Sequence, residues 1–125
     1  MTALETLRQA MQLARTARTD DAIAMLSQYL ESADPVSSKH ELALLARNAG
    51  LLCDNASRLP ECTKYYEEAL RLEPEDVHTL LALGDAFARA GNDERASHYW
   101  KLFEDAAAAS KSTEDQELLA RYRSR

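Results

Sequence analysis

Two cysteines and three histidines are the residues of this sequence whose types could do redox or metal chemistry. Cys53 and Cys62 lie nine positions apart, and two thiols are too few for a disulfide framework. The histidines show no ligand spacing relative to either cysteine. We therefore interpret both cysteines as reduced core thiols at positions that need small buried residues, with a redox or metal pair as the open alternative. The three histidines are His40, His78 and His98.

Adjacent carboxylates form a second group of reactive residues, at Asp20-Asp21, Glu67-Glu68 and Glu75-Asp76. Each pair falls on a helix surface or at a helix start, where we expect the charges to be solvated. No serine or cysteine has a histidine and an acid at a motif spacing, and no glycine-rich loop precedes a helix to hold phosphate. We therefore expect a protein that is not an enzyme, with no catalytic residues, no cofactor and no metal.

The bulk composition limits the class of partner. The chain has 125 residues, a net charge of −6 and a pI near 5.0, and no stripe of Lys and Arg is visible, which argues against nucleic acid. No apolar run approaches the roughly 18 residues of a membrane span. The first residues, Met1–Glu5, contain neither a basic n-region nor an apolar h-region, so we expect no signal peptide and a cytoplasmic protein.

The elements that must position these side chains are predicted to be helices, since the chain has only 3 Gly and 3 Pro and is rich in good helix formers. Thr2 with Glu5, and Ser38 with Glu41, fit capping boxes. The predicted helices cover about 3–17, 19–33, 38–55, 60–73, 76–90, 92–109 and 113–123.

Single residues mark the other predicted ends. Thr19 is expected to cap the second helix, Asp34-Pro35 to end it, and Gly91 to adopt a left-handed conformation between the fifth and sixth helices. In the first helix, the predicted apolar face consists of Leu4, Leu7, Met11 and Ala14.

A period of 34 residues organises the second half of the chain. Small and aromatic residues recur at this interval, and such a period is typical of stacked helix pairs. A single pair cannot bury its own apolar face, so small residues let two helices approach while aromatic residues fill the gaps between pairs. From Ala22 to Cys62 the interval is 40, six more than the period, so we expect the third helix to start more than a turn early. The groove residues of the first pair are assigned to within one residue. The recurring residues are Gly50, Cys62, Tyr66 and Ala69, followed by Gly84, Ala96, Trp100 and Phe103.

This pattern resembles the tetratricopeptide repeat family. Leu80, Leu83, Gly84, Phe87, Ala96 and Trp100 stand where the family has its signature residues, whereas Phe103 and Ala108 replace its usual small residue and proline. The resemblance implies an all-α, right-handed superhelix of three antiparallel helix pairs with a C-terminal capping helix, in a single domain of residues 1–125. The implied pairs are about 3–33, 38–72 and 76–109, and the capping helix is about 113–123.

The resemblance also implies a function, because such arrays bind a peptide or a partner helix in a concave groove lined by the first helix of each pair. Arginine forks suit carboxylates, so the expected partner is a protein or peptide with an acidic or C-terminal segment. The family's clamp for heat-shock chaperone tails is mostly absent. The predicted partner-binding residues are Arg8, Gln12, Arg15, Arg47, Asn48, Leu51, Asn55, His78, Leu81, Asp85 and Arg89.

Several interpretations stay open at this point. The polar residues of the groove are equally explained as solvated positions on exposed helix faces. The leading hypothesis is a small adaptor or assembly factor without chemistry. The alternatives are a dedicated chaperone of an aggregation-prone subunit, such as a secretion-system component, and a structural unit that self-associates into a homo-oligomer.

Overall fold

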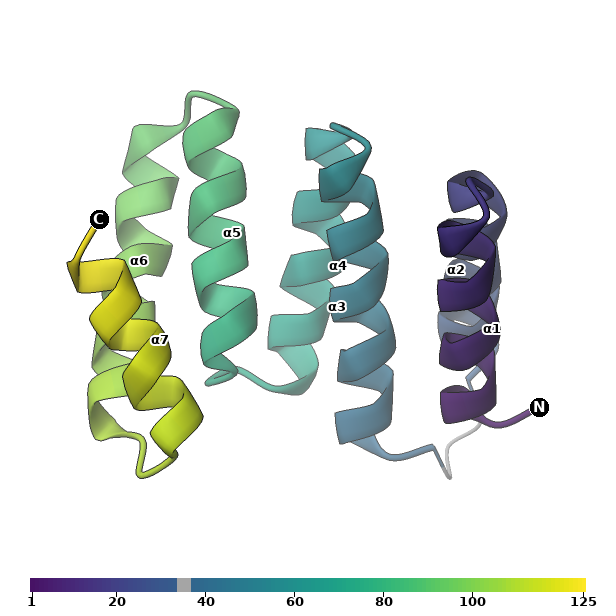
Figure 1. Ribbon diagram of the computed structural model, residues 1–125, viewed down its shortest axis with the longest axis horizontal. Helices are drawn as coiled ribbons and strands as arrows, with labels where there is room; N and C mark the ends of the chain where they lie inside the picture. Colours follow the sequence, from purple (N-terminus) through teal and green to yellow (C-terminus); the bar gives the residue numbers. More distant parts are fainter. Residues whose placement is uncertain (34–36) are drawn as a thin grey trace. The chain divides into compact units, whose positions relative to one another are not determined.

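Helices make up the structure, a computed structural model that describes residues 1–33 and 37–125 (Figure 1). This described part contains seven α-helices and no strand, so the all-α prediction is confirmed. Every predicted helix is present, with its ends within a turn of the expected residues. The helices are α1 (Ala3–Arg15), α2 (Thr19–Glu31), α3 (Lys39–Asn55), α4 (Leu59–Leu72), α5 (Val77–Arg89), α6 (Asp93–Ala109) and α7 (Thr113–Arg123).

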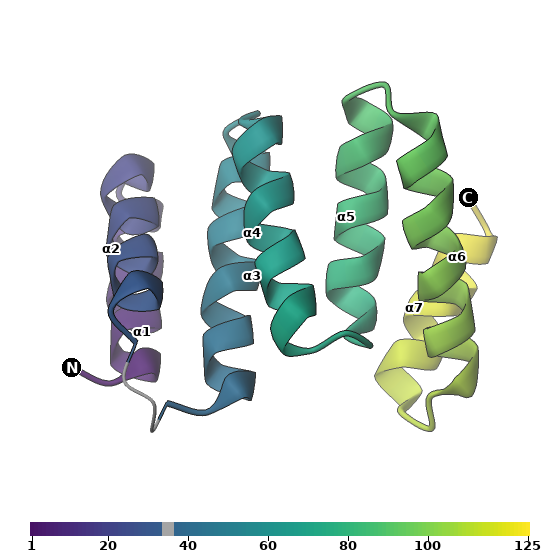
Figure 2. The same cartoon turned by 180° about the vertical axis from the view of Figure 1, so that it is seen from behind.

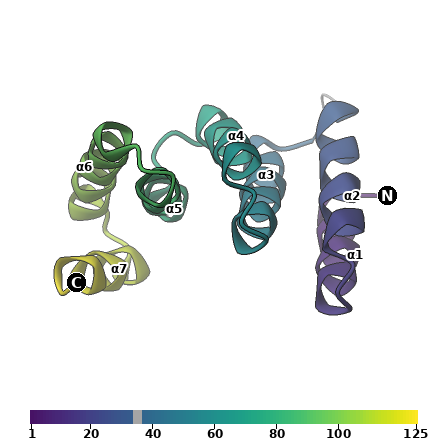
Figure 3. The same ribbon diagram turned by 90° about the horizontal axis from the view of Figure 1, so that it is seen from above.

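The helices form two compact units, which we call unit 1 (Met1–Pro74) and unit 2 (Glu75–Arg125). In unit 1, α1 pairs with α2, α3 pairs with α4, and both helices of the first pair contact α3. Seen from behind and from above, α1 and α3 form one layer of this unit and α2 and α4 the other (Figures 2 and 3). In unit 2, α5 pairs with α6 and α7 packs obliquely, mainly on α6. A single domain over the whole chain stays a prediction.

The same left-handed turn joins the two helices of each pair. The residues with positive φ are Ala17 (62°), Ser57 (61°) and Gly91 (80°), so the prediction for Gly91 is confirmed. In each turn the following N–H donates to the carbonyl five residues earlier, for example Asn92 to Phe87 at 2.9 Å, as in a Schellman motif. The three turns lie 40 and 34 residues apart, which gives equivalent positions in the three pairs.

Two predicted helix starts are confirmed by their hydrogen bonds. The Thr2 hydroxyl accepts from the Glu5 N–H at 3.1 Å, and the Ser38 hydroxyl accepts from the Glu41 N–H at 3.0 Å. Each bond satisfies one of the N–H groups that the first turn of a helix leaves without an intrahelical partner.

The predicted cap of the second helix is wrong. Thr19 is the first residue inside α2, and the capping position belongs to Arg18, whose side chain makes no capping bond. The left-handed turn explains the shift, because the Arg18 N–H donates to the Leu13 carbonyl at 2.9 Å and closes α1 immediately before α2 begins. The helix ends at Glu31, and the predicted stop signal at Asp34-Pro35 lies outside the described residues.

Glycine and an aromatic ring form the central contact of two helix pairs. A Cβ built on Gly50 would lie 2.6 Å from the Tyr66 ring, and one built on Gly84 would lie 2.4 Å from the Trp100 ring. Real Cβ atoms do not approach so closely, so both positions require glycine for packing. In the first pair the equivalent residues are Ala10 and Leu26, which are both fully buried.

The apolar face of α1 differs from the prediction. Its buried residues are Ala3, Thr6 and Ala10, while Leu4 is 47% exposed. Small residues rather than the predicted leucines are therefore the buried residues of α1. This places Leu4 on the outer side of α1.

The last helix covers the α5–α6 pair with an apolar side. Leu119 is buried, and Leu118 and Tyr122 are half-buried. The Tyr122 ring meets Phe103 edge-on, with ring centroids 5.1 Å apart. These contacts agree with a helix that closes the end of unit 2.

Candidate functional site

The predicted partner-binding residues fall into two sets, one in each unit. The first set lies on α1 and α3, which form one layer of unit 1 (Figure 3), and the second set lies on α5 of unit 2. A single surface made of both sets stays a prediction. The first set is Arg8, Gln12, Arg15, Arg47, Asn48, Leu51 and Asn55, and the second is His78, Leu81, Asp85 and Arg89.

The turns fix the register of the first helix pair and separate Gln12 from the other residues of its set. With offsets of 40 and 34, Gln12 is equivalent to the buried Leu52 and Ala86. Gln12 is exposed and lines a hollow of about 410 Å³ on α1 and α2. The other residues that line this hollow are Gln9, Leu13, Thr16 and Met25. The role of Gln12 in partner binding stays a prediction.

Two residues of α1 were missed by sequence reasoning. Met11 is equivalent to Leu51 and Asp85, and Leu4 is equivalent to Leu44 and His78, by the same offsets. The sequence already shows the 40-residue interval between Ala22 of α2 and Cys62 of α4. Applied to the first helices, it places Met11 rather than Gln12 in register with Leu51.

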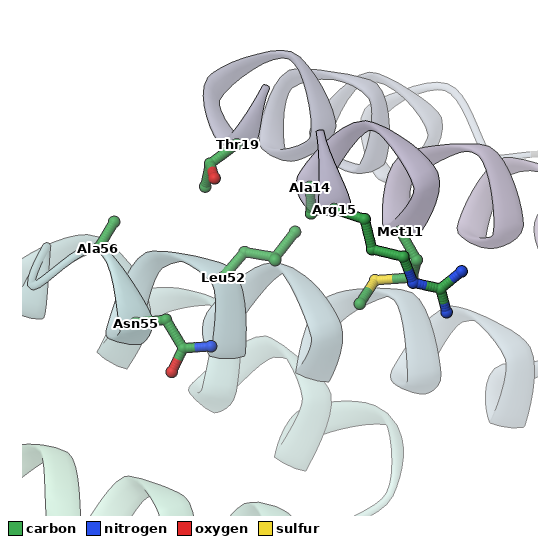
Figure 4. A pocket seen from close by; sticks show the side chains of 7 residues that line it. All are labelled: Met11, Ala14, Arg15, Thr19, Leu52, Asn55 and Ala56. Atoms are coloured by element: carbon green, nitrogen blue, oxygen red, sulfur yellow. The ribbon is translucent and has the colours of Figure 1, made fainter. Parts of the chain in front are cut away.

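Met11 and Arg15 line a second hollow, of about 340 Å³, between the C-terminal ends of α1 and α3 (Figure 4). Apolar side chains of both helices meet across it, and Leu52 points from α3 toward Ala14 of α1. Polar side chains, including the predicted residues Arg15 and Asn55, lie at its edge. The full lining is Met11, Ala14, Arg15, Thr19, Leu52, Asn55 and Ala56.

Two leucines and two arginines are among the exposed residues of α1 and α3. Leu4 is 47% and Leu51 is 43% exposed. Arg8 and Arg15 are exposed and have no ion-pair partner among the residues that the structure describes. We name this surface the α1–α3 face and define it by Leu4, Arg8, Met11, Arg15, Leu51 and Asn55.

The two remaining predicted residues of α3 are half-buried. The Asn48 amide donates to the Leu44 carbonyl of its own helix at 2.8 Å, which reduces its capacity to bind a partner. Arg47 makes contacts within the protein. The binding roles of both residues stay predictions.

In unit 2, residues of α7 and the C-terminus engage α5. His78 pairs with Glu114 at 3.2 Å between Nε2 and Oε1. The Asp85 carboxylate accepts two bonds from the Arg125 guanidinium, at 2.9 and 3.0 Å, and a third from Trp100 Nε1 at 3.0 Å. The side-chain hydrogen bond to Asp85 raises the pKa of Arg125 above its ordinary value.

The other predicted residues of α5 are Leu81 and Arg89. Leu81 is half-buried, and Arg89 is exposed at the end of the helix, where it interacts with other residues of the protein. Their assignment to a binding surface stays a prediction.

The thiols are poorly placed for chemistry. Cys53 and Cys62 are free and buried, and burial, with the nearby Glu61 carboxylate, raises the pKa of Cys53 to about 11. The Cys53 thiol is therefore protonated at neutral pH, whereas the thiolate is the nucleophile and the metal ligand. Within residues 1–33 and 37–125, no three His, Cys, Asp or Glu side chains are grouped to hold a metal ion, and no helix is long and apolar enough to cross a membrane.

Known proteins share the fold and part of the sequence. No protein-family model matches the chain. Over 85 residues it is 31% identical to Photosystem I assembly protein Ycf3 of Prochlorococcus marinus, strains NATL1A and NATL2A. This match covers 66% of the chain and 49% of each relative, so the chain spans about half the length of the curated relatives it matches. A solved structure of a MamA mutant matches 85% of this chain and 98% of its own, with a TM-score of 0.50 and 16% identity, which shows the fold alone.

The antiparallel helix pairs resemble those of the tetratricopeptide repeat in fold. The two departures from the tetratricopeptide pattern have structural explanations. Phe103 is fully buried and packs against Tyr122 of α7, so the neighbouring helix accommodates a large residue there. Ala108 lies inside α6, which continues to Ala109, where proline would end a helix.

Proposed function

We propose that this protein is a protein-binding module, an adaptor or assembly factor, whose α1–α3 face binds a segment of a partner protein. The observation that carries the proposal is the accessibility of this face. Leu4 and Leu51 are each more than two-fifths exposed, and Arg8 and Arg15 have no ion-pair partner in the described part of the chain. At the equivalent positions of α5, His78 and Asp85 are already paired with residues of α7 and the C-terminus.

The chemistry of the face indicates the chemistry of the partner. Exposed leucines gain free energy when a partner's apolar side chains remove them from water. Arginine guanidinium groups bind carboxylates through two parallel hydrogen bonds. A segment that carries both apolar and acidic residues satisfies both requirements, and an amphipathic helix or an extended peptide can present them.

The comparisons support an assembly role at a coarse level. The relatives that match 66% of this chain are named as assembly proteins. Because only 49% of their length is matched, the identity of their partners is not transferred to this chain. The proposed role is binding without catalysis, and the cytoplasmic location stays a prediction.

Partner capture with a matched pair of variants tests the proposal. Leu51→Glu places a charge on the α1–α3 face, and Leu102→Glu places the same charge on α6, where the leucine is 40% exposed against 43% for Leu51. Proteins captured from the native cell extract by wild type and both variants are compared by quantitative mass spectrometry. We expect Leu51→Glu to lose a partner that Leu102→Glu retains. Equal capture by all three proteins would count against the α1–α3 face.

A dedicated chaperone is the second candidate, and the exposed leucines of α1 and α3 favour it. Leu4 and Leu51 add apolar surface to the open side of unit 1, which would hold an aggregation-prone subunit. Co-expression distinguishes the two roles. A chaperone keeps in solution a partner that is insoluble when expressed alone, whereas an adaptor binds a partner that is soluble by itself.

A further inference from the structure

In unit 2, the junction between α5 and α7 is filled by side chains. Asp85 on α5 accepts both hydrogen bonds of the Arg125 guanidinium, and that guanidinium lies 5.2 Å from the centre of the Tyr122 ring. Two large side chains from the end of α7 and the C-terminus therefore cover this position.

The equivalent junction in unit 1 holds a hollow. Met11 takes the place of Asp85 and faces the C-terminal end of α3, which offers Leu52, Asn55 and Ala56 (Figure 4). None of these residues matches the combined bulk of a tyrosine and an arginine, and a volume of about 340 Å³ is left between the helices. This volume lies at the lower end of the range of ligand pockets and is large enough for a leucine, methionine or tyrosine side chain.

The lining of the hollow defines what it can receive. Its centre is apolar, since Met11, Ala14, Leu52 and Ala56 supply hydrocarbon surface and no charge. The C-terminal ends of α1 and α3 carry partial negative charge, and Thr19 brings the partially positive start of α2 to the same lining. Arg15 is the charged side chain of the lining, and it can bind a carboxylate directly.

We propose that this hollow receives one large apolar side chain of the partner segment, and that Arg15 binds a carboxylate immediately beside that side chain. The inference rests on the proposed function, because it specifies the anchor residue of a partner on the α1–α3 face. It adds a requirement that the proposed function does not contain: the apolar group and the carboxylate must be adjacent.

Two small probes separate the apolar and the charged requirement. N-acetyl-leucine carries a leucine side chain next to a carboxylate, and N-acetyl-leucinamide has the same side chain without the charge. Titration of the isotope-labelled full chain is followed by NMR. We expect saturable shifts of residues around the hollow with N-acetyl-leucine, at a dissociation constant of roughly 1–10 mM for a ligand of this size, and at least about threefold weaker binding of the amide. No saturable shifts, shifts confined to other residues, or equal binding of the amide would each overturn the proposal.

Matched variants locate the probe. Ala56→Phe fills the hollow from an exposed position at the end of α3, and Ala109→Phe makes the same change at the exposed end of α6. Arg15→Glu reverses the charge at the edge, and Arg123→Glu does so on α7. We expect the first variant of each pair to abolish the shifts and the second to retain them. Retention by both Ala56→Phe and Arg15→Glu would overturn the proposal, and circular dichroism verifies that each variant is folded.

The same variants distinguish this inference from the proposed function. If Leu51→Glu loses a captured partner while Ala56→Phe retains it fully, the α1–α3 face binds a partner but the hollow does not hold an anchor. If neither variant loses any partner, the proposed function itself fails.

Discussion

Unit 1 and unit 2 build their cores on the same contact but differ in the chemistry of their first helices. In unit 1, Tyr66 lies against Gly50 and its hydroxyl donates to Asp54 at 3.3 Å. In unit 2, Trp100 lies against Gly84 and its indole N–H donates to Asp85 at 3.0 Å. Both rings thus pack on a glycine of the preceding helix and find a carboxylate on that helix.

The two units differ in the residue at the position of Asp85 and in what that residue contacts. Asp85 also pairs with Arg125, so unit 2 uses this position of its first helix to hold its own C-terminus. Leu51, the equivalent residue of unit 1, is 43% exposed. In unit 2, α7 covers the α5–α6 pair with the buried Leu119 and with Tyr122, whose ring meets Phe103. Equivalent positions of the repeat therefore serve closure in unit 2 and stay accessible in unit 1.

The largest expected effect comes from removing the two rings. Tyr66 is 1% exposed and Trp100 is half-buried, so we expect Tyr66→Ala to lower the free energy of unfolding by about 4 kcal/mol and Trp100→Ala by about 3 kcal/mol. Urea denaturation followed by circular dichroism measures both. A midpoint unchanged from wild type in either variant would refute a shared packing role for the two rings.

Adding one methyl group to Gly50 or Gly84 tests the contact between the glycine and the aromatic ring without changing the ring. A Cβ at Gly84 or Gly50 would meet a rigid ring at 2.4 or 2.6 Å, so we expect Gly84→Ala and Gly50→Ala each to cost about 1–3 kcal/mol. Gly91→Ala is the control, because nothing lies within 4 Å of its Cβ position; its left-handed backbone limits the cost to about 1 kcal/mol. If Gly91→Ala were the most damaging of the three, the glycines would serve the backbone rather than the packing.

The fold was largely predictable from the sequence because its determinants are local or periodic. Capping residues such as Thr2 and Ser38 mark helix starts through single hydrogen bonds, and the 34-residue period follows from the packing of Tyr66 and Trp100. The cap at Thr19 was mispredicted because the left-handed turn before it contains alanine, and only Gly91 among the three turns carries the residue that usually signals this conformation.

The candidate site was less predictable, since side chains from distant parts of the chain decide it. The pairing of Asp85 with Arg125 joins residues 40 positions apart, and no local pattern indicates it. The hollow beside Met11 depends on small side chains, including Ala14 and Ala56, that meet only in the folded unit.

Breaking the ion pair between Asp85 and Arg125 is expected to lower stability less than the changes at the rings and glycines. Arg125→Glu places a like charge beside Asp85, and we expect it to lower the stability of the full chain by about 0.5–1 kcal/mol, because the pair is partly exposed to solvent. Arg123→Glu is the matched control on the exposed side of α7 and shares the unfavourable helix-dipole term. Thermal melts at low and high salt measure both. Equal destabilisation by the two variants would show that the link between Asp85 and Arg125 contributes nothing.

The smallest effect is a gain in stability. Ala17 and Ser57 adopt positive φ without being glycine, at a cost of roughly 1–2 kcal/mol per residue. Glycine relieves this strain but increases the entropy of the unfolded chain, so we expect Ala17→Gly and Ser57→Gly each to stabilise the protein by about 0.5 kcal/mol. Chemical denaturation of the double variant makes the gain measurable. A loss of stability would contradict the equivalence of these turns with the one at Gly91.

The central claim is that the α1–α3 face of unit 1 is the surface that binds a partner. Partner capture from the native extract by Leu51→Glu and Leu102→Glu tests it most directly, because two leucines of nearly equal exposure receive the same charge on different helices. We expect Leu51→Glu to lose a partner that wild type and Leu102→Glu both retain. Undiminished capture by Leu51→Glu, or loss of the same partner by both variants, would contradict it.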